Sequence, residues 1–182
     1  MLTVKAKLMD EGAMRRTLVR MAHEIVEKND SAERLCFIGI HRRGVPLAKE
    51  LAQNVSRFSG IPCDVGSVDI ILHRDDRAEG AADPTVTNTK IDFSIENQTV
   101  ILVDDVIFTG RTIRAAMDTL MSKGRPAKIQ LAVLIDRGHR ELPIRGDYVG
   151  KNVPTSRKER ISVRVSEYDG ETGVYVCAPQ EN

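Results

Sequence analysis

The sequence predicts an α/β domain built around a central, mostly parallel sheet. Short, largely apolar segments at residues 35–40, 98–103 and 129–135 are typical of strands buried on both faces. Segments with helical periodicity alternate with these strands, which is the order found in parallel sheets flanked by helices. Ligands of such sheets bind at the carboxyl ends of the strands. We therefore expect functional residues in the loops after residues 40, 72, 103 and 135.

The first predicted element is an amphipathic helix over residues 10–28, with Asp10 as its N-cap. Its apolar residues recur at helical spacing: Met14, Leu18, Met21 and Ile25. Arg16, Arg20 and His23 fall on the opposite side, so this helix has one core face and one basic face.

The remaining elements follow in the same alternation. After strand 35–40 and the turn HRRG, a helix begins at about residue 45. A second strand covers residues 65–72, and a helix covers residues 112–123 after strand 98–103. The C-terminal segments ISVRV and VYVC are predicted as strands that close an edge of the sheet, within a small irregular hood.

Composition predicts a globular protein with one domain over residues 1–182. Hydrophobic residues make up 41% of the chain and charged residues 29%, which excludes a disordered chain. The apolar runs are much shorter than the ~20 residues of a membrane-spanning helix. The cysteines at 36, 63 and 177 have no metal-site spacing, and the N-terminus has no signal-peptide pattern. We expect a cytoplasmic protein with reduced thiols.

The net charge of +1 conceals a basic segment near the C-terminus. Residues 137–164 hold eight Lys or Arg against three acidic residues, with His139 among them. This segment is a candidate surface for a polyanion, and the alternative is an ordinary solvated face. The chain has no Trp, four Phe and three Tyr, which argues against a platform that stacks unpaired bases on aromatic rings.

The segment VILVDDVIFTGRT at residues 100–112 carries the most specific chemical signal. A buried strand delivers two adjacent carboxylates, Asp104 and Asp105, and then a short loop leads into a helix. Free N–H groups at a helix N-terminus, with hydroxyls from Thr109 and Thr112, suit a phosphate. The carboxylates can accept hydrogen bonds from vicinal sugar hydroxyls. A phosphorylated ribose satisfies both requirements, although a lone Asp-Asp pair can also be a simple turn.

This segment resembles the phosphoribosyl pyrophosphate (PRPP) motif of type I phosphoribosyltransferases. The resemblance implies that Asp104 and Asp105 hold the ribose hydroxyls. It also implies Mg²⁺ held mainly by substrate and water, with Asp104 and Asp105 as candidate protein ligands. The residues that would wrap the 5′-phosphate are Val106, Ile107, Phe108, Thr109, Gly110, Arg111 and Thr112.

Two further loops resemble parts of the same enzymes. GIHRRG at residues 39–44 resembles their pyrophosphate loop, with Arg42 or Arg43 neutralising the leaving group. The alternative is that both arginines are surface charges. Residues 72–90 resemble the flexible lid that excludes water, and Arg74 and Arg77 are expected to reach the pyrophosphate.

A closer resemblance extends over about the whole chain. LAVLIDRGHRELPIRGDYVGKNVPTS at residues 131–156 is similar to the signature of the PyrR family. RRTLVRMAHEI, GIHRRGVPLAKEL, VDIILHRDD and VDDVIFTGRT fit the same family. The resemblance implies a bifunctional protein. It converts uracil and PRPP to UMP and pyrophosphate, and it binds the leader of pyrimidine-operon mRNA to promote transcription attenuation when UMP or UTP is bound.

The base specificity is expected to follow from the loops after residues 107 and 135. Hypoxanthine–guanine enzymes have an acid before T-G-x-T, whereas this chain has Phe108, so purine chemistry is disfavoured. Backbone groups of the loop that starts at Ile135 are expected to recognise uracil, with Arg137 donating to a carbonyl. We expect a dissociative reaction in which pyrophosphate leaves before uracil N1 attacks.

The PyrR resemblance also implies an RNA surface and an oligomer. Two short basic patches suit one RNA loop better across a homodimer or higher oligomer than within a monomer. The alternatives are a purely metabolic nucleobase phosphoribosyltransferase and a non-catalytic RNA regulator, which RNA binding and pyrophosphate release would distinguish. The expected RNA-binding residues are Arg16, Arg20, His23, His139, Arg140, Arg145 and Lys151.

Overall fold

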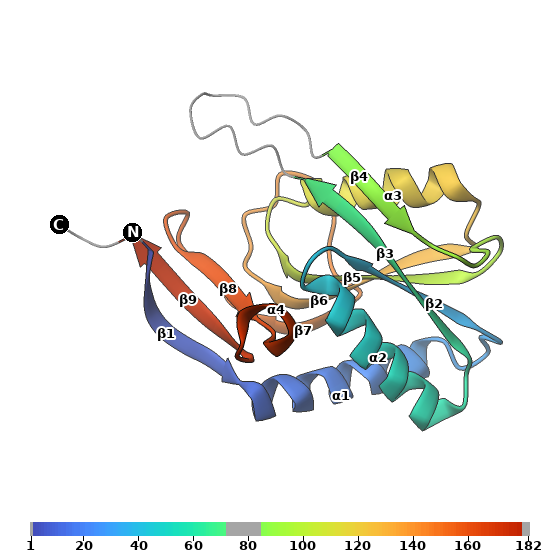
Figure 1. Ribbon diagram of the computed structural model, residues 1–182, viewed down its shortest axis with the longest axis horizontal. Coiled ribbons are helices and arrows are strands. Elements are labelled where there is room, and N and C mark those ends of the chain that lie inside the picture. The colour runs from blue at the N-terminus through green and yellow to red at the C-terminus, as the bar shows by residue number, and fades with distance from the viewer. Residues whose placement is uncertain (1, 72–84, 180–182) are drawn as a thin grey trace.

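The computed structural model describes residues 2–71 and 85–179, which form two sheets and four helices (Figure 1). The larger sheet has the order β4-β3-β2-β5-β6-β7, and only the β3–β4 pair is antiparallel. The predicted mostly parallel sheet is therefore confirmed. Its strands are β2 (Leu35–Ile40), β3 (Cys63–Ile71), β4 (Thr85–Lys90), β5 (Thr99–Ile107), β6 (Lys128–Asp136) and β7 (Tyr148–Asn152).

Helices cover both faces of this sheet (Figure 1). Helices α1 (Glu11–Lys28) and α2 (Gly44–Ser59) lie on one face, and α3 (Arg111–Lys123) lies on the other. Asp10 caps α1 as predicted, because its Oδ1 accepts a hydrogen bond of 2.7 Å from the Ala13 N–H. Among the described residues, no helix is long and apolar enough to cross a membrane.

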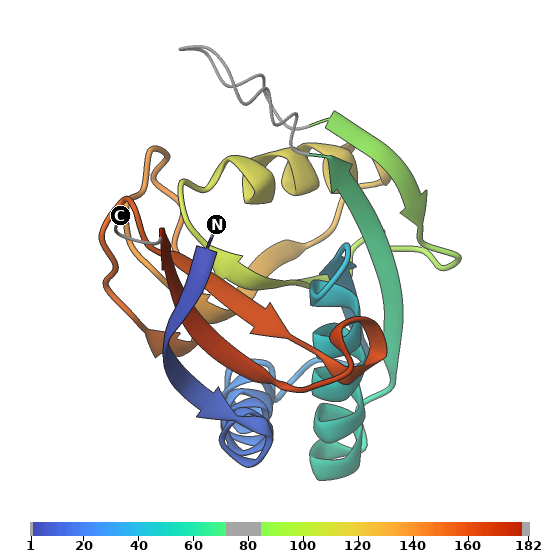
Figure 2. The same cartoon turned by 60° about the vertical axis from the view of Figure 1, so that its left-hand side comes forward.

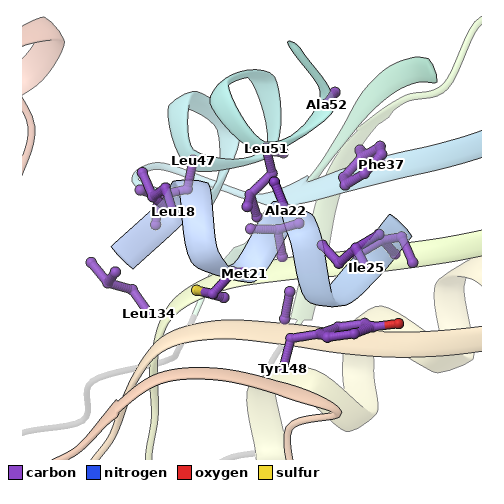
Figure 3. Packing of buried hydrophobic residues seen from close by; sticks show 14 of the residues in the cluster. Leu18, Met21, Ala22, Ile25, Phe37, Leu47, Leu51, Ala52, Leu134 and Tyr148 are labelled. Atoms are coloured by element: carbon purple, nitrogen blue, oxygen red, sulfur yellow. The ribbon is translucent and has the colours of Figure 1, made fainter. Parts of the chain in front are cut away.

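The predicted apolar stripe of α1 is buried in the main core. Figure 3 shows side chains of α1 lying between those of α2 and the ring of Tyr148. The hydroxyl of Tyr148 lies 3.0 Å from both the Asn29 amide nitrogen and Gln130 Oε1. This buried polar contact ties the end of α1 to the first residues of β6 and β7.

The C-terminal strands form a separate antiparallel sheet with the N-terminus (Figure 2). Its order is β1-β9-β8, from β1 (Leu2–Asp10), β9 (Gly173–Pro179) and β8 (Arg160–Arg164), and the short helix α4 (Ser166–Asp169) follows β8. We call this sheet with α4 the hood. The predicted strands exist, but the expectation that they close an edge of the main sheet is wrong. Residues 2–10, which the sequence analysis did not assign to a strand, provide the pairing edge for β9.

Two other boundaries differ from the prediction. Strand β5 continues past the two aspartates to Ile107, because its backbone stays paired with β6 up to Asp136. Residues 85–90 form β4 against β3 instead of an irregular loop, as the alternating threonines of TVTNTK favour. The rest of the predicted lid, with Arg74 and Arg77, lies outside the described residues.

Substitution of Gly44 with alanine should destabilise the fold, because α2 begins in contact with β5. A Cβ atom at Gly44 would lie 2.5 Å from the Val103 carbonyl oxygen, so the backbone would have to shift. We expect a loss of about 1–3 kcal/mol in the free energy of unfolding, measured by urea denaturation. Gly12→Ala is the control, since its Cβ would meet only flexible side chains. Equal stability of Gly44→Ala and wild type would contradict this close packing.

Candidate active site

The two aspartates lie near the carboxyl end of β5, a central strand between β2 and β6. The side chain of Asp104 is buried, and its Oδ1 accepts a 2.9 Å hydrogen bond from the Asp105 N–H. Asp105 Oδ1 accepts a hydrogen bond of the same length from the Val106 N–H. Backbone hydrogen bonds therefore hold both carboxylates in place before any ligand binds.

This carboxylate pair is electrostatically unfavourable in the ligand-free protein. Burial raises the pKa of Asp104 well above its usual value, and the neighbouring charge of Asp105 raises it further. Burial also raises the pKa of Asp105, while hydrogen bonding from Asp104 and the positive charge of Arg43 oppose that increase. A cation or a set of hydroxyl donors bound here would stabilise the ionised forms.

The loop after β5 leaves a helix N-terminus open beside the carboxylates. Gly110 is the N-cap of α3 and adopts a left-handed φ of 94°. It provides no side-chain cap, and Thr109 Oγ1 accepts a 3.3 Å hydrogen bond from the Arg111 N–H. Arg111 also pairs with Glu141. Amide groups at such a terminus are a suitable site for a phosphate.

The predicted pyrophosphate loop connects β2 to α2 and contacts the hood. The guanidinium of Arg43 donates two hydrogen bonds to Asp169 of α4, at 3.1 Å from Nε and 2.8 Å from Nη2. These bonds hold the pKa of Asp169 below its usual value. Arg42 is exposed. Sequence reasoning did not identify Asp169, because its partner lies 126 residues away along the chain.

Arg137 is buried and held by protein groups. Its guanidinium donates to Thr155 Oγ1 and to the carbonyl oxygens of Ser156 and Glu159 at 2.7–3.1 Å. It also lies 4.1 Å from the centre of the exposed Phe108 ring. The side chain of Ile135 is fully buried. Arg137 thus connects the loop after β5 to the chain segment that precedes β8.

The predicted RNA-binding residues come from two elements that meet in the structure. Arg20 of α1 donates to the carbonyl oxygens of Val149 and Gly150 in β7, at 3.1 and 2.6 Å. The ring of His23 stacks on Phe58 at 4.1 Å. Lys151 and Arg16 are exposed near these contacts on β7 and α1. The basic face of α1 and the basic edge strand β7 are therefore neighbours.

Two further predicted RNA-binding residues, in the loop after β6, also have protein partners. The His139 ring lies against the Thr155 carbonyl oxygen and packs edge-on against Phe108. Arg140 donates to Ile144 O at 2.8 Å and Phe108 O at 2.9 Å. In contrast, Arg145 and Lys151 form no hydrogen bond or ion pair with the residues that the structure describes, and both are exposed.

The chain is similar to known proteins over nearly its whole length. A model of the phosphoribosyl transferase domain matches residues 6–167. Bifunctional protein PyrR of Caldicellulosiruptor bescii is 56% identical over 170 residues, which cover 93% of this chain and 93% of that protein. Bifunctional protein PyrR of Deinococcus radiodurans is 50% identical and covers 97% of both. The chain belongs to the PyrR family.

Solved structures of more distant relatives have the same fold. Hypoxanthine phosphoribosyltransferase of Trypanosoma cruzi matches with a TM-score of 0.77 at 20% identity, covering 97% of this chain and 96% of that one. A hypoxanthine-guanine phosphoribosyltransferase of Bacillus anthracis matches with a TM-score of 0.73 at 16% identity, covering 97% and 98%. The predicted type I phosphoribosyltransferase fold is confirmed.

Asp104→Asn should stabilise the ligand-free protein and change its pH dependence. The pKa of Asp104 is higher in the folded than in the unfolded chain, so the folded chain binds more protons between the two values. The free energy of unfolding should therefore fall as pH rises from about 4 through the folded pKa. Because the variant lacks this ionisable group, its free energy of unfolding should fall less than that of wild type between pH 4 and pH 8.

Urea denaturation of both proteins between pH 4 and pH 8 measures this difference. Asp118→Asn is the control, since Asp118 is exposed and pairs with Arg114 of the same helix. If the free energy of unfolding of Asp104→Asn changes with pH in parallel with that of wild type, the Asp104 charge does not destabilise the folded protein and the prediction is wrong.

Proposed function

We propose that this protein is a uracil phosphoribosyltransferase that also binds pyrimidine-operon leader mRNA and promotes transcription attenuation. The observation that carries the catalytic part is the buried Asp104 with the half-buried Asp105, on the strand that leads to the N-terminus of α3, where Gly110 offers no side-chain cap. One ligand that needs both features is a ribose 5-phosphate group. The PyrR relatives and the phosphoribosyl transferase domain support the same activity.

The ribose of PRPP binds across the end of β5. Asp104 and Asp105 accept hydrogen bonds from its 2′- and 3′-hydroxyls, and the N–H groups of residues 106–112 bind its 5′-phosphate. When the bond from C1′ to pyrophosphate breaks, positive charge develops on the ribose. The buried carboxylates stabilise that charge strongly because little water screens them.

Magnesium fits this site as a cation that enters with PRPP. Mg²⁺ prefers oxygen ligands and is often held by one or two carboxylates together with substrate phosphates. The raised pKa values of Asp104 and Asp105 show two carboxylates that lack a full counter-charge, with Arg43 as a partial one. When bound, the ion neutralises charge on the pyrophosphate and on these carboxylates.

The leaving pyrophosphate lies toward the loop between β2 and α2. Arg42 is exposed there and is able to move toward the phosphates, whereas Asp169 positions Arg43. Arg77 of the predicted lid is a further ligand in this proposal. Pyrophosphate departs with the electron pair of the C1′–O bond, uracil N1 forms the new bond to C1′, and the N1 proton passes to pyrophosphate or water.

Uracil binds between Phe108 and the loop after β6. Phe108 occupies the position where purine enzymes carry an acid, and its exposed ring is braced by Arg137. With the guanidinium of Arg137 engaged by three protein oxygens, backbone groups of residues 135–138 provide most of the hydrogen bonds to uracil.

The regulatory part rests on the basic surface formed by α1 and β7. Arg16, Arg20, Arg145 and Lys151 provide cations for RNA phosphates, and His23 provides a further polar contact. UMP or UTP in the active site favours this binding, and a homodimer or higher oligomer joins two such surfaces. The proposed substrates and RNA partner support a cytoplasmic location. A purely metabolic phosphoribosyltransferase would have no need of this surface.

Asp104→Asn and Asp105→Asn should each reduce the rate of UMP formation from uracil and PRPP by roughly 100-fold or more. Each change weakens the hold on the ribose as positive charge develops. The rate is measured in the presence of Mg²⁺, with folding checked by circular dichroism. Asp118→Asn should retain wild-type activity. A folded double variant with full activity would remove the two carboxylates from the mechanism.

Arg16→Ala and Lys151→Ala should weaken binding of leader RNA without changing uracil phosphoribosyltransferase activity. Each lost phosphate contact should reduce the slope of log K against log salt by about 0.7–1. Arg15→Ala is the control, because Arg15 is on the same helix and pairs with Glu11. Identical slopes for all three variants and wild type would mean that these residues do not contact RNA.

A further inference from the structure

A cavity of about 370 Å³ lies beside the edge strand β7, separate from the ribose and phosphate site. Its walls come from the end of β6, the loop that follows and β7, including Asp136, Arg140, Val149 and Asn152. Asp104, Asp105, Phe108 and Thr109 do not line it. Asp136 and Gly138 of the loop proposed to bind uracil also line it, so the cavity adjoins the proposed base site.

One wall of the cavity is a guanidinium group fixed in a single plane. Arg140 Nε donates to Ile144 O at 2.8 Å, Nη1 donates to Phe108 O at 2.9 Å, and Nη2 pairs with the Asp136 carboxylate. Its side chain is 19% exposed. Because acceptors from the loop after β5, from the end of β6 and from the loop after β6 hold it, the plane of the Arg140 guanidinium is set before any ligand arrives.

Among the charged residues that line the cavity, Asp136 and Arg140 pair with each other and Arg145 has no partner in the described residues, so the ion-paired part favours a neutral ligand. The ion pair between Asp136 and Arg140 neutralises both groups, and most N–H groups of Arg140 already have protein acceptors. Val149 and Gly146 add small apolar surface. The Asn152 side chain is exposed at the rim and forms no hydrogen bond with other described residues, so its amide is available to both donors and acceptors.

The position of the cavity connects it to the basic surface. Strand β7 provides Val149 and Asn152 to the cavity, while the carbonyls of Val149 and Gly150 accept the hydrogen bonds from Arg20 of α1. Arg145, at the cavity mouth, has no partner among the described residues. An RNA strand that follows the basic surface therefore passes the opening.

We propose that this cavity binds one unstacked nucleobase of the bound RNA. The base stacks on the guanidinium plane of Arg140, and the amide of Asn152 hydrogen-bonds to the base edge. Arg145 contacts the adjoining phosphate. Proteins read single-stranded RNA by stacking bases on arginine planes as well as on aromatic rings, and this chain has few aromatic residues. The inference rests on the proposed RNA binding and adds a source of sequence specificity.

The test is a scan of leader RNA in which each loop nucleotide in turn is replaced by an abasic one. With the wild-type protein, one position should weaken binding by about tenfold. With the Asn152→Ala and Arg140→Lys proteins, the abasic substitution at the same position should weaken binding by less than about twofold. In these variants the base has already lost one of its contacts with the protein. Both variants should keep the wild-type salt slope, since neither removes a positive charge.

Asn88→Ala is the matched control, an exposed asparagine in β4 at the opposite edge of the sheet. It should show the wild-type abasic profile. If Asn152→Ala and Arg140→Lys also show the wild-type profile at every position, the base pocket is refuted while RNA binding stands. If the wild-type protein does not bind leader RNA at all, the proposed regulatory function fails first.

Discussion

The position of the Asp104 and Asp105 carboxylates at the end of β5, the first buried and the second half-buried, is the constraint on which the candidate active site depends. Apolar strands on both sides exclude water from these groups, and two backbone N–H groups fix their oxygens. The charge is unfavourable without a ligand, so the site is prepared for cations and hydroxyl donors. Burying these charges destabilises the folded protein, and two extensive hydrophobic clusters provide the stability that offsets this cost.

Long-range contacts by arginine then position the loops around this pair. Arg43 connects the loop after β2 to Asp169 of the hood, and Arg137 connects the loop after β6 to the segment before β8. Arg140 connects the same loop to the carbonyl of Phe108. These three side chains bring loops from distant parts of the sequence to one end of the sheet. One short segment, residues 137–146, follows β6 at the proposed uracil site and leads to β7 of the basic surface.

The sequence predicted the parallel sheet and the helices because apolar runs and helical periodicity are local patterns. The two aspartates and the T-G-x-T segment were identified for the same reason, since the residues that form this motif are adjacent in the sequence. The hood sheet was missed because β1 and β9 lie at opposite ends of the chain, and their pairing has no local signal. Sequence reasoning treated Arg137, Arg140 and Arg43 as free cations, whereas the structure gives each of them protein partners. The domain count and the individual site residues stay predictions.

Proton release on binding PRPP with Mg²⁺ tests the central claim most directly. Isothermal titration calorimetry near pH 6, in buffers of different ionisation enthalpy, gives the number of protons released by wild type and by Asp104→Asn. The account predicts that wild type releases more protons than the variant, because burial raises the pKa of Asp104 and the incoming cation and ribose hydroxyls lower it again. Equal proton release by the two proteins would show that Asp104 is already ionised, and it would contradict the account.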